Sequence, residues 1–538
     1  MSAAPRLRVP VIPLAERTPT VELLLAIIAQ QQTTIAALEQ RVSALEAEVR
    51  RLKGLPPRPK LKPSALENNR DDDDPPPSGG APPGRKRAGS KKRRKRLKVH
   101  RSVIIAPEPL PPGSRLRGYQ DFFVQDLLIA PRNTRYRLAR YQTPAGEHLT
   151  GQLPQYLNNA HFGPTLISYI VHQHHHQRVT QPLLLNQLRQ WGVDISSGQL
   201  NRLLIEHNET FHQEKDQLLR AGLAASAYVH VDDTGARHRG QNGYCTHIGN
   251  EHFAFFESTA SKSRINFLEL LRTPYTDYHL NQAAWDYLCE HKLPRPPLDQ
   301  LRAGAKHFND EPAWRAQLDA LNITDERHRR IATEGALIGS LHHHALHQEL
   351  VIISDDAGQF DVLRHALCWI HAERNIQSLL PLNALHVQAL QATREALWTL
   401  YDQLKAYKLK PNAKTKRAIN KRFDTLCKTK TDFQSLNQAL KRLHQNKAEL
   451  LLVLQRPDIP LHNNLSERDI RDYVIKRKIS GSTRSEEGRR ARDTFASLKK
   501  TCQKLGIGFW DYLLDRLTLS NNIPPLPQLV AQAASRPP

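Results

Sequence analysis

Apolar residues recur with a seven-residue period close to the amino terminus of the chain. β-Branched residues fill the first position of each heptad and leucine fills most of the fourth positions, which favours a parallel two-stranded coiled coil. The sequence therefore predicts a dimerisation helix over residues 20–53. An amphipathic helix that packs on its own domain has a similar pattern, so this alternative stays open. The two positions are filled by Val21, Ile28, Ile35, Val42 and Val49, and by Leu24, Gln31, Leu38, Leu45 and Leu52.

Residues 54–118 have the composition of a linker. Proline and aspartate runs come first, and the stretch from Arg85 to Arg101 then holds eleven Lys or Arg among 17 positions. Blocks of like charge are typically disordered, and basic blocks bind the phosphates of nucleic acids. The stretch predicts a DNA-binding arm, although a nuclear-import signal has the same composition. Its densest part consists of Lys92, Arg93, Arg94, Lys95 and Arg96.

Residues 119–222 are expected to be helical, because their apolar residues recur at helical spacing. One helix is predicted from Pro182 to Trp191, ended by Gly192, and a second begins after Ser196 or Ser197. Two short helices around a glycine turn resemble a helix-turn-helix, whose second helix enters the major groove of DNA. A plain helical bundle fits the pattern equally well. The side chains that the second helix would offer to DNA are Gln199, Asn201 and Arg202.

Two short apolar runs, Tyr228 to Val231 and Leu350 to Ser354, predict buried β-strands. Two further runs, Tyr244 to Gly249 and His252 to Phe256, predict a hairpin beside the first strand. Acidic pairs follow the first two runs, and open α/β sheets bind ligands at the carboxyl ends of their strands. Aspartate at such places is also a common turn or helix-capping residue. The pairs are Asp232 with Asp233, and Asp355 with Asp356.

A third carboxylate, Glu467, lies within a stretch rich in cations. Two carboxylates about 4 Å apart repel by roughly 4 kcal/mol at an effective dielectric of 20, so a cluster of Asp232, Asp355 and Glu467 needs a cation. Oxygen ligands favour Mg²⁺ or Mn²⁺, and two such ions could act on a phosphodiester. The spacing of Asn464 and Glu467 also fits a capping box, a purely structural role. The cations predicted to contact DNA are Arg468, Arg471, Lys476, Arg477 and Lys478.

Other glutamates compete with Glu467 for the place of the third acid. Glu373 follows Asp355 by only 18 residues. Glu486 and Glu487 fall in a Ser/Gly-rich stretch that is expected to be a mobile loop, and a mobile loop is a poor mount for a metal ligand. Glu467 is therefore preferred.

Two histidine clusters raise the question of a further metal site. They are His172 with His174 to His176, and His342 to His344. Metal sites built from histidine are usually completed by cysteine or carboxylate ligands. No such residue lies near either cluster in the sequence, so no metal binding is predicted there.

Composition points to a polyanionic partner. The 538 residues carry a formal net charge of +24, with an isoelectric point near 9.9. The five cysteines are dispersed without a C-x-x-C pair, which fits a reducing compartment and argues against a cysteine zinc site. No apolar run approaches the length of a membrane span and no signal peptide is recognised, so a cytoplasmic, DNA-associated protein without membrane contact is expected.

Several separate motifs, in the right order, resemble bacterial insertion-sequence transposases of the IS66 type. The region around the third acid reads IPLHNNLSERDIRDYVIKRK and continues as SGSTRSEEGRRARDTFASLKKTCQKLG, before Tyr512-Leu513. The string SDDAGQF resembles the motif of the second acid, and CWIHAER is similar to a Cys-Trp-x-His-x-x-Arg signature. Asp232-Asp233-Thr234 stands where the family has Asp-Glu-Thr. The likeness covers roughly residues 20 to 517.

The resemblance implies a DDE-type transposase that cuts the ends of its own element and joins them to target DNA. The expected fold is an α/β RNase H-like catalytic core at 223–480 with helical insertions at about 265–345 and 382–458. A helical DNA-binding region and the coiled coil precede this core, and a helical region at 481–538 follows it. Asp232, Asp355 and Glu467 are carried over as the catalytic, metal-binding acids, with two Mg²⁺ or Mn²⁺ ions, and His371 and Arg374 as possible support.

Two departures from the family pattern stand out. The 122 residues between the first and second acids make a longer segment than expected, and the amino-terminal cysteine motif is missing from YQTPAGEHLTGQLP. The expected partners are double-stranded DNA, at least one more copy of the chain, and accessory proteins of the same element. A noncatalytic DNA-binding derivative of a transposase is the main alternative, and a nucleic-acid hydrolase unrelated to transposition is the next.

Overall fold

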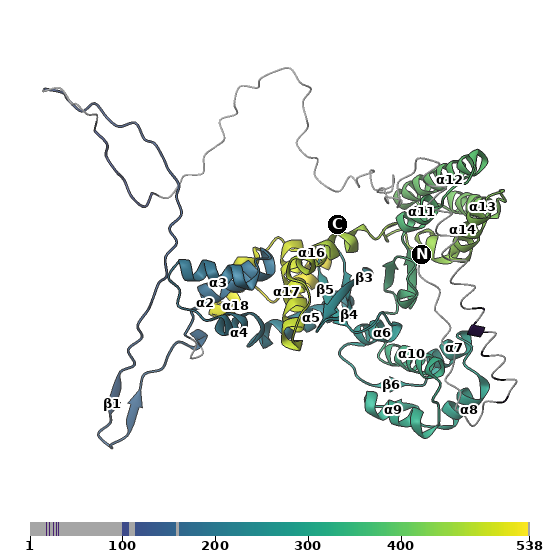
Figure 1. Cartoon of the computed structure of the whole chain (residues 1–538), viewed down its shortest axis with the longest axis horizontal. Helices are drawn as coiled ribbons and strands as arrows, with labels where there is room; N and C mark the ends of the chain where they lie inside the picture. The colour runs from purple at the N-terminus through teal and green to yellow at the C-terminus, as the bar shows by residue number, and fades with distance from the viewer. Residues whose placement is uncertain are drawn as a thin grey trace.

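The computed structural model describes residues 99–106, 113–157 and 161–535, together with six single positions between residues 18 and 31 (Figure 1). The predicted coiled coil at 20–53 lies almost entirely outside the described residues. The densest part of the basic arm, from Lys92 to Arg96, lies outside them as well. Both therefore stay predictions.

A five-stranded mixed sheet forms the centre of the fold (Figure 1). The strand order is β5-β4-β3-β8-β9, with antiparallel pairing from β5 to β3 and parallel pairing from β3 to β9. The predicted hairpin is present as β4 and β5. The strands are β3 (Tyr228–His238), β4 (Gln241–Gly249), β5 (Ala254–Thr259), β8 (Val351–Ser354) and β9 (Arg364–Leu367).

Strand β3 is longer than its apolar run predicted. Its pairing with β4 continues to His238 opposite Gln241, across a two-residue turn in which Arg239 and Gly240 both have positive φ. Asp232 therefore lies in the middle of a strand, and its predicted place at a strand end is wrong. The prediction failed because strand length is set here by a partner strand rather than by local hydrophobicity.

Helix α17 (Glu486–Lys504) protects the outer edge of the sheet. Alternate backbone N–H groups of β5 donate hydrogen bonds to side chains four residues apart on α17. The bonds run from Ala254 to Thr501 Oγ1 (3.1 Å), from Phe256 to Ser497 Oγ (2.9 Å) and from Ser258 to Asp493 Oδ2 (2.9 Å). The side chains satisfy N–H groups that would otherwise offer an unpaired edge.

Among the described residues from 119 to 163 there is no α-helix, contrary to the prediction, and only a short 3-10 helix at Gln155–Leu157. Residues 113–139 have no regular secondary structure, and a small hairpin follows, formed by β1 (Arg140–Gln142) and β2 (His148–Thr150). The helices begin later, as α2 (Pro164–Val171), α3 (Gln181–Gln190), α4 (Ser197–Ile205) and α5 (Glu209–Ala224). The first three share a small core that includes Ile170, Leu184, Leu188 and Leu200.

The first histidine cluster forms a π-helical turn, His172–His176, after α2. His175 is buried against the ring of Phe495, at 4.5 Å between ring centroids. His172 and His176 stack on Phe509. These contacts make the cluster part of the packing between α2 and the carboxy-terminal helices.

Two helical segments form separate lobes, one between strands of the sheet and the other after its last strand, between α11 and α16 (Figure 1). The first, between β5 and β8, contains α6 (Arg264–Arg272), α7 (Gln282–Glu290), α8 (Arg295–Ala303), α9 (Glu311–Ala320) and α10 (Glu326–His343). It also holds a two-stranded ribbon of β6 (Tyr278–His279) and β7 (His307–Phe308). The second consists of α12 (Ala384–Leu409), α13 (Ala413–Lys428), α14 (Gln434–Gln445) and α15 (Lys447–Leu450).

The remaining helices bring the site together and close the fold. They are α11 (Trp369–Gln377), α16 (Asn464–Ser480), α18 (Phe509–Thr518) and α19 (Leu526–Ala534). Among the described residues, no helix is both long enough and apolar enough to cross a membrane.

Candidate active site

The alternation of side chains along β3 separates Asp232 from Asp233. Successive residues of a strand point to opposite faces, so Asp232 shares a face with Ala236, which packs against Ile470 of α16. Asp233 points to the other face, where it accepts hydrogen bonds from Thr246 Oγ1 (2.6 Å) and Gln359 Nε2 (2.9 Å). Asp232 is thus the aspartate that faces the helix carrying Glu467.

Asp355 and Asp356 also have different surroundings. Asp355 comes directly after the last residue of β8, the strand beside β3, and its Oδ1 is buried without a hydrogen-bond partner among the described residues. Asp356 accepts hydrogen bonds from Arg442 Nε (2.6 Å) and Asn446 Nδ2 (3.2 Å) at the end of α14. A buried oxygen without a donor is costly, so Asp355 fits a cation ligand better than Asp356 does.

Glu467 lies in the first turn of α16 and faces α11. Its Oε1 accepts a hydrogen bond from Arg374 Nη1 at 3.0 Å and lies 3.4 Å from His371 Nε2. About a quarter of each of these three side chains is exposed. The family signature around His371 and Arg374 therefore contacts the predicted third acid directly.

The other two acids act electrostatically on Asp232. Burial, together with the negative charges of Asp355, Asp233 and, to a smaller extent, Glu467, raises the pKa of Asp232 to about 7. The oxygens of the three acids do not all lie within 4.8 Å of one another. The described groups of possible metal ligands that are this close lie elsewhere in the fold. Like charges repel, and Glu467 pairs with Arg374 and His371 instead.

Asn463 fixes the start of α16 against β3. Its Nδ2 donates to the carbonyl of Val231 (2.8 Å), and its Oδ1 lies 2.9 Å from His230 Nδ1. Asn464 is the first residue of the helix and makes no cap, so the predicted capping box with Glu467 is wrong. The amide that could cap the helix is used instead to hold it next to Asp232.

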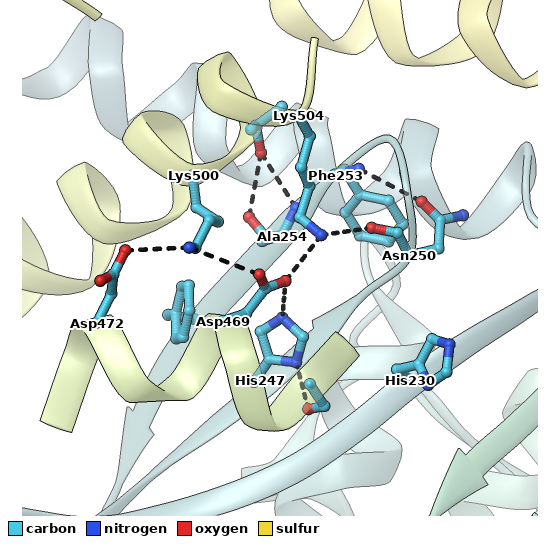
Figure 2. A network of polar contacts seen from close by, with 12 residues as sticks. His230, His247, Asn250, Phe253, Ala254, Asp469, Asp472, Lys500 and Lys504 are labelled. Atoms are coloured by element: carbon cyan, nitrogen blue, oxygen red, sulfur yellow. Dashed lines mark hydrogen bonds and ion pairs between the residues drawn. The ribbon is translucent and has the colours of Figure 1, made fainter. Parts of the chain in front are cut away.

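A second set of contacts holds the following turn of α16 onto the sheet (Figure 2). His247 of β4 places Nδ1 2.7 Å from Ser466 Oγ and Nε2 3.2 Å from Asp469 Oδ2. Lys504 of α17 lies 2.8 Å from the same carboxylate, and Lys500 bridges Asp469 and Asp472. Burial opposes ionisation of Asp469, but the hydrogen bond and charge of His247, with the charge of Lys504, lower its pKa to about 2.

The competing glutamates have other partners. Glu373 is buried and accepts two hydrogen bonds from Arg394 of α12, at 2.8 and 2.9 Å. Glu486 is the first residue of α17 and pairs with His238 and Arg489. The expectation that Glu486 and Glu487 lie in a mobile loop is wrong, because Ser485 caps a helix there.

The predicted DNA-contacting cations of α16 fall into two groups. Arg468, Arg471 and Lys478 are exposed. Arg477 is half-buried and donates to the carbonyl of Gly235. Lys476 is buried and donates to the carbonyl of His174 (2.6 Å), while burial and the charge of Lys499 lower its pKa to about 7. The structure thus contradicts the prediction that Lys476 contacts DNA.

The helix-turn-helix side chains are also partly committed to local structure. Gln199 forms a capping box with Ser196, at 2.9 and 3.2 Å. Asn201 accepts a hydrogen bond from Gln181 of α3 at 3.2 Å. Arg202 is exposed. Of the three predicted readers, Arg202 is the exposed one and Gln199 and Asn201 are half-buried, and their contact with DNA stays a prediction.

No sequence pattern pointed directly to the residues that support the acids. His230 and His247 come from β3 and β4, and Asn463 and Asp469 come from the start of α16. One signal was available: His230 precedes Asp232 by two residues, and this spacing puts both side chains on one face of the strand. The contacts themselves depend on how α16 packs on the sheet, which no local pattern specifies.

Comparison with known proteins defines the class to which this arrangement belongs. Residues 349–491 match the Transposase IS66 family. This range includes Asp355, Glu467 and the helices between them, whereas Asp232 lies before it. No solved structure matches the chain.

The uncharacterized protein y4jO of Sinorhizobium fredii is 47% identical to the chain over 321 residues. The aligned region covers 59% of this chain and 100% of y4jO. The chain belongs to the same family as y4jO, and it carries a Transposase IS66 family domain.

Proposed function

We propose that the protein is a DDE-type DNA transposase that cuts the ends of its own insertion sequence and joins them to target DNA. The observation that carries this proposal is the raised pKa of Asp232, to which the charges of Asp355 and Glu467 contribute; the three acids come from β3, the end of β8 and α16. The transposase-family domain at residues 349–491 supports the reaction class.

The sheet supports an RNase H-like core. An antiparallel hairpin flanks β3 on one side and the parallel strand β8 flanks it on the other, which is the arrangement expected for that fold. The helical segments between β5 and β8, and between α11 and α16, then correspond to insertions into the core.

The donor set fits Mg²⁺ or Mn²⁺. All three candidate ligands are carboxylates, one of their oxygens is buried without a donor, and the raised pKa of Asp232 means that its ionised form lacks a stabilising cation. When bound, such ions supply charge neutralisation at the phosphodiester and activation of the attacking oxygen.

The chain's own residues orient the site. Asn463 and His247 fix α16, so Glu467 is presented from a rigid first turn. Arg374 and His371 hold the Glu467 carboxylate from the opposite side, and the Arg374 guanidinium supplies positive charge beside it. We infer that these two side chains position Glu467 and contact the phosphate of the bound strand.

Binding of DNA is assigned to the exposed cations. Arg468, Arg471 and Lys478 lie on the helix that carries Glu467, where they can hold the scissile strand by its phosphates. Arg202 on α4 is the candidate for reading a base edge in the major groove. The basic arm from Arg85 to Arg101 is expected to add sequence-independent affinity.

The experiment uses the purified full-length chain, Mg²⁺ and duplexes taken from the two DNA flanks of its gene. The proposal predicts a nick at the boundary of an inverted repeat, followed by joining of the new 3′-end to unrelated DNA. Cutting without joining would indicate a hydrolase outside transposition. Specific binding without cutting would indicate a noncatalytic derivative.

A further inference from the structure

The lobe between β5 and β8 gathers one aspartate and four histidines from three separate segments. Asp277 and His279 lie at the start of the lobe's ribbon, His307 lies on the paired strand β7, and His343 and His344 end helix α10. The register of the ribbon puts His279 directly opposite His307. Sequence alone showed only His342 to His344, since the carboxylate is more than sixty residues away.

Asp277 lies at the centre of this group. Its Oδ2 is 2.9 Å from His279 Nε2, 2.7 Å from His344 Nε2 and 3.9 Å from His307 Nε2. Ligands about 2.0–2.1 Å from a tetrahedral ion lie roughly 3.3 Å from one another. The three separations from Asp277 Oδ2 lie around that value, and the histidine rings have to turn for their nitrogens to surround one ion together with this oxygen.

Two overlapping sets within the group satisfy a metal-ligand distance limit. Candidate ligand atoms of His279, His343 and His344 all lie within 4.8 Å of one another, and so do those of Asp277, His279 and His307. His279 belongs to both sets. Asp277 and His344 fall in different sets, so the two sets have to close on one another around a shared ion.

The surroundings hold the ligands in place. Ser340 Oγ donates to Asp277 Oδ1 (2.6 Å), which leaves Oδ2 directed at the histidines. The ring of Tyr275 stacks on His344 at 3.5 Å between centroids. Supporting contacts of this kind orient metal ligands in known sites. The group is also at the carboxyl end of α10, where the helix dipole favours a cation.

Gly339 allows the ribbon to approach α10 closely enough to form the group. A Cβ at this position would collide with the carbonyl oxygen of His279. The absence of a side chain therefore lets β6 lie directly on the helix, one turn before His343 and His344. This close approach has no function in the acidic site.

We propose that this lobe binds one Zn²⁺ ion, or a similar borderline transition-metal ion, through Asp277, His279 and His344. The fourth ligand is His343 or His307, one from each overlapping set. Imidazole nitrogens with a single carboxylate suit zinc, whereas the all-carboxylate site suits Mg²⁺ or Mn²⁺. The ion ties the ribbon to the end of α10 and so stabilises the lobe.

The test measures Zn²⁺ binding to the metal-free full-length chain by competition with a chromophoric chelator. Binding of one equivalent is expected, with a rise in the thermal unfolding temperature and, for Co²⁺, a visible spectrum of tetrahedral coordination. Asp277→Asn, His279→Gln and His344→Gln should each weaken binding by about 100-fold or more, because second-shell changes alone cost 10–100-fold. Ser340→Ala should weaken Zn²⁺ binding by roughly 10–100-fold, because Ser340 supports a ligand without being one.

His342→Gln is the matched control, because His342 is an exposed neighbour on the same helix and belongs to neither set. It should leave the affinity unchanged. His343→Gln and His307→Gln identify the fourth ligand, since only one of them should weaken binding strongly. His307 is half exposed, so its substitution should preserve folding, and circular dichroism checks each variant.

A double variant, Asp232→Asn with Glu467→Gln, separates this inference from the proposed function. It should bind Zn²⁺ as the unchanged chain does. If zinc binding is lost in this double variant and survives Asp277→Asn and His344→Gln, the ion occupies the acidic site and the inference is overturned. Weak binding that no variant alters would show an adventitious ion only, which overturns it as well.

Discussion

At the scale of single residues, the position of Asp232 combines two unfavourable conditions. It is largely buried and it faces the negative charges of Asp355 and Glu467. A carboxylate in such a place is retained at a cost in stability, which is common at functional sites. The cost is relieved by a proton or a cation, so it links folding to both pH and divalent ions.

The raised pKa of Asp232 leads to a prediction about pH. The folded chain holds this proton up to about pH 7, whereas an unfolded aspartate loses it near pH 4. The stabilisation by protonation is therefore present below about pH 4 and is lost as the pH rises to about 7. Mg²⁺ or Mn²⁺ should then raise the unfolding temperature more at pH 8 than at pH 5.5, as measured by differential scanning calorimetry.

Asp232→Asn should stabilise the metal-free chain at pH 8, by an amount on the order of 4 kcal/mol at most. It should also remove the rise in unfolding temperature that Mg²⁺ causes. Asp402→Asn, an exposed substitution on α12, serves as the control and should change neither quantity. An Mg²⁺ effect of equal size at both pH values would contradict the link between Asp232 and the ion.

At the scale of secondary-structure elements, α16 is held to the sheet by buried polar contacts in addition to the apolar contacts of Ile470 and Tyr473. Asp469 is buried between His247 and Lys504 and has a low pKa, about 2. Removing one partner of a buried ion pair leaves the other charge uncompensated. The helix that presents Glu467 is therefore expected to lose much of its attachment when the Asp469 carboxylate, two residues further along, is removed.

Asp469→Asn should lower the free energy of unfolding by about 3–5 kcal/mol at pH 7, as measured by urea denaturation. Because the pKa of Asp469 is lowered, its stabilisation is present above about pH 4 and is lost as the pH falls towards 2. The difference in the free energy of unfolding between the variant and the unchanged chain should shrink over that pH range. Lys478→Gln, an exposed change on the same helix, should alter the free energy of unfolding by no more than about 0.5 kcal/mol. Equal effects of the two substitutions would refute the role of Asp469.

The sequence predicted the local elements better than the contacts between them. The apolar runs correctly indicated strands before Asp232 and Asp355, and the glycine turn correctly separated α3 from α4. The length of β3 was missed because pairing with β4 extends it. Lys476 appeared to be one more surface cation, and only the packing of α16 on His174 shows that it is buried.

The candidate site was predictable in part for the same reason. Family motifs identified Asp232, Asp355 and Glu467, and the structure places them on neighbouring elements, while their catalytic role stays a prediction. The Asp277 group could not be predicted, because its members come together only through the ribbon and the end of α10. Contacts across such separations depend on tertiary packing and not on local periodicity.

At the scale of the whole molecule, charge determines the expected interaction with DNA. The net charge of +24 is concentrated partly in the arm from Arg85 to Arg101. Deleting the arm should flatten the dependence of log affinity on log salt, because each neutralised phosphate contributes a slope of about −0.9. The preference for the element ends should remain, as measured by fluorescence anisotropy.

Arg202→Ala should have the opposite effect. It should reduce the preference for the element ends and leave the slope of log affinity against log salt nearly unchanged. If the arm deletion abolishes the preference while Arg202→Ala leaves it intact, the two assignments are reversed.

Assembly is the other property of the whole chain. The heptads at 20–53 predict that the chain dimerises through a parallel coil. Replacing Ile35 and Leu38 by aspartate should convert the dimer to a monomer in sedimentation velocity, whereas Glu39→Gln, at a position outside the apolar seam, should not. A dimer that survives the double substitution would place the interface elsewhere.

The central claim is that Asp232, Asp355 and Glu467 form one centre for DNA cleavage and joining. The most direct measurement compares Glu467→Gln with Glu373→Gln in Mg²⁺-dependent cleavage of element-end duplexes. Both changes keep the size of the side chain, and both glutamates pair with an arginine. Glu467→Gln is expected to fold and bind DNA without cleaving it, while folded Glu373→Gln is expected to cleave. Cleavage by the folded Glu467→Gln variant would contradict the account.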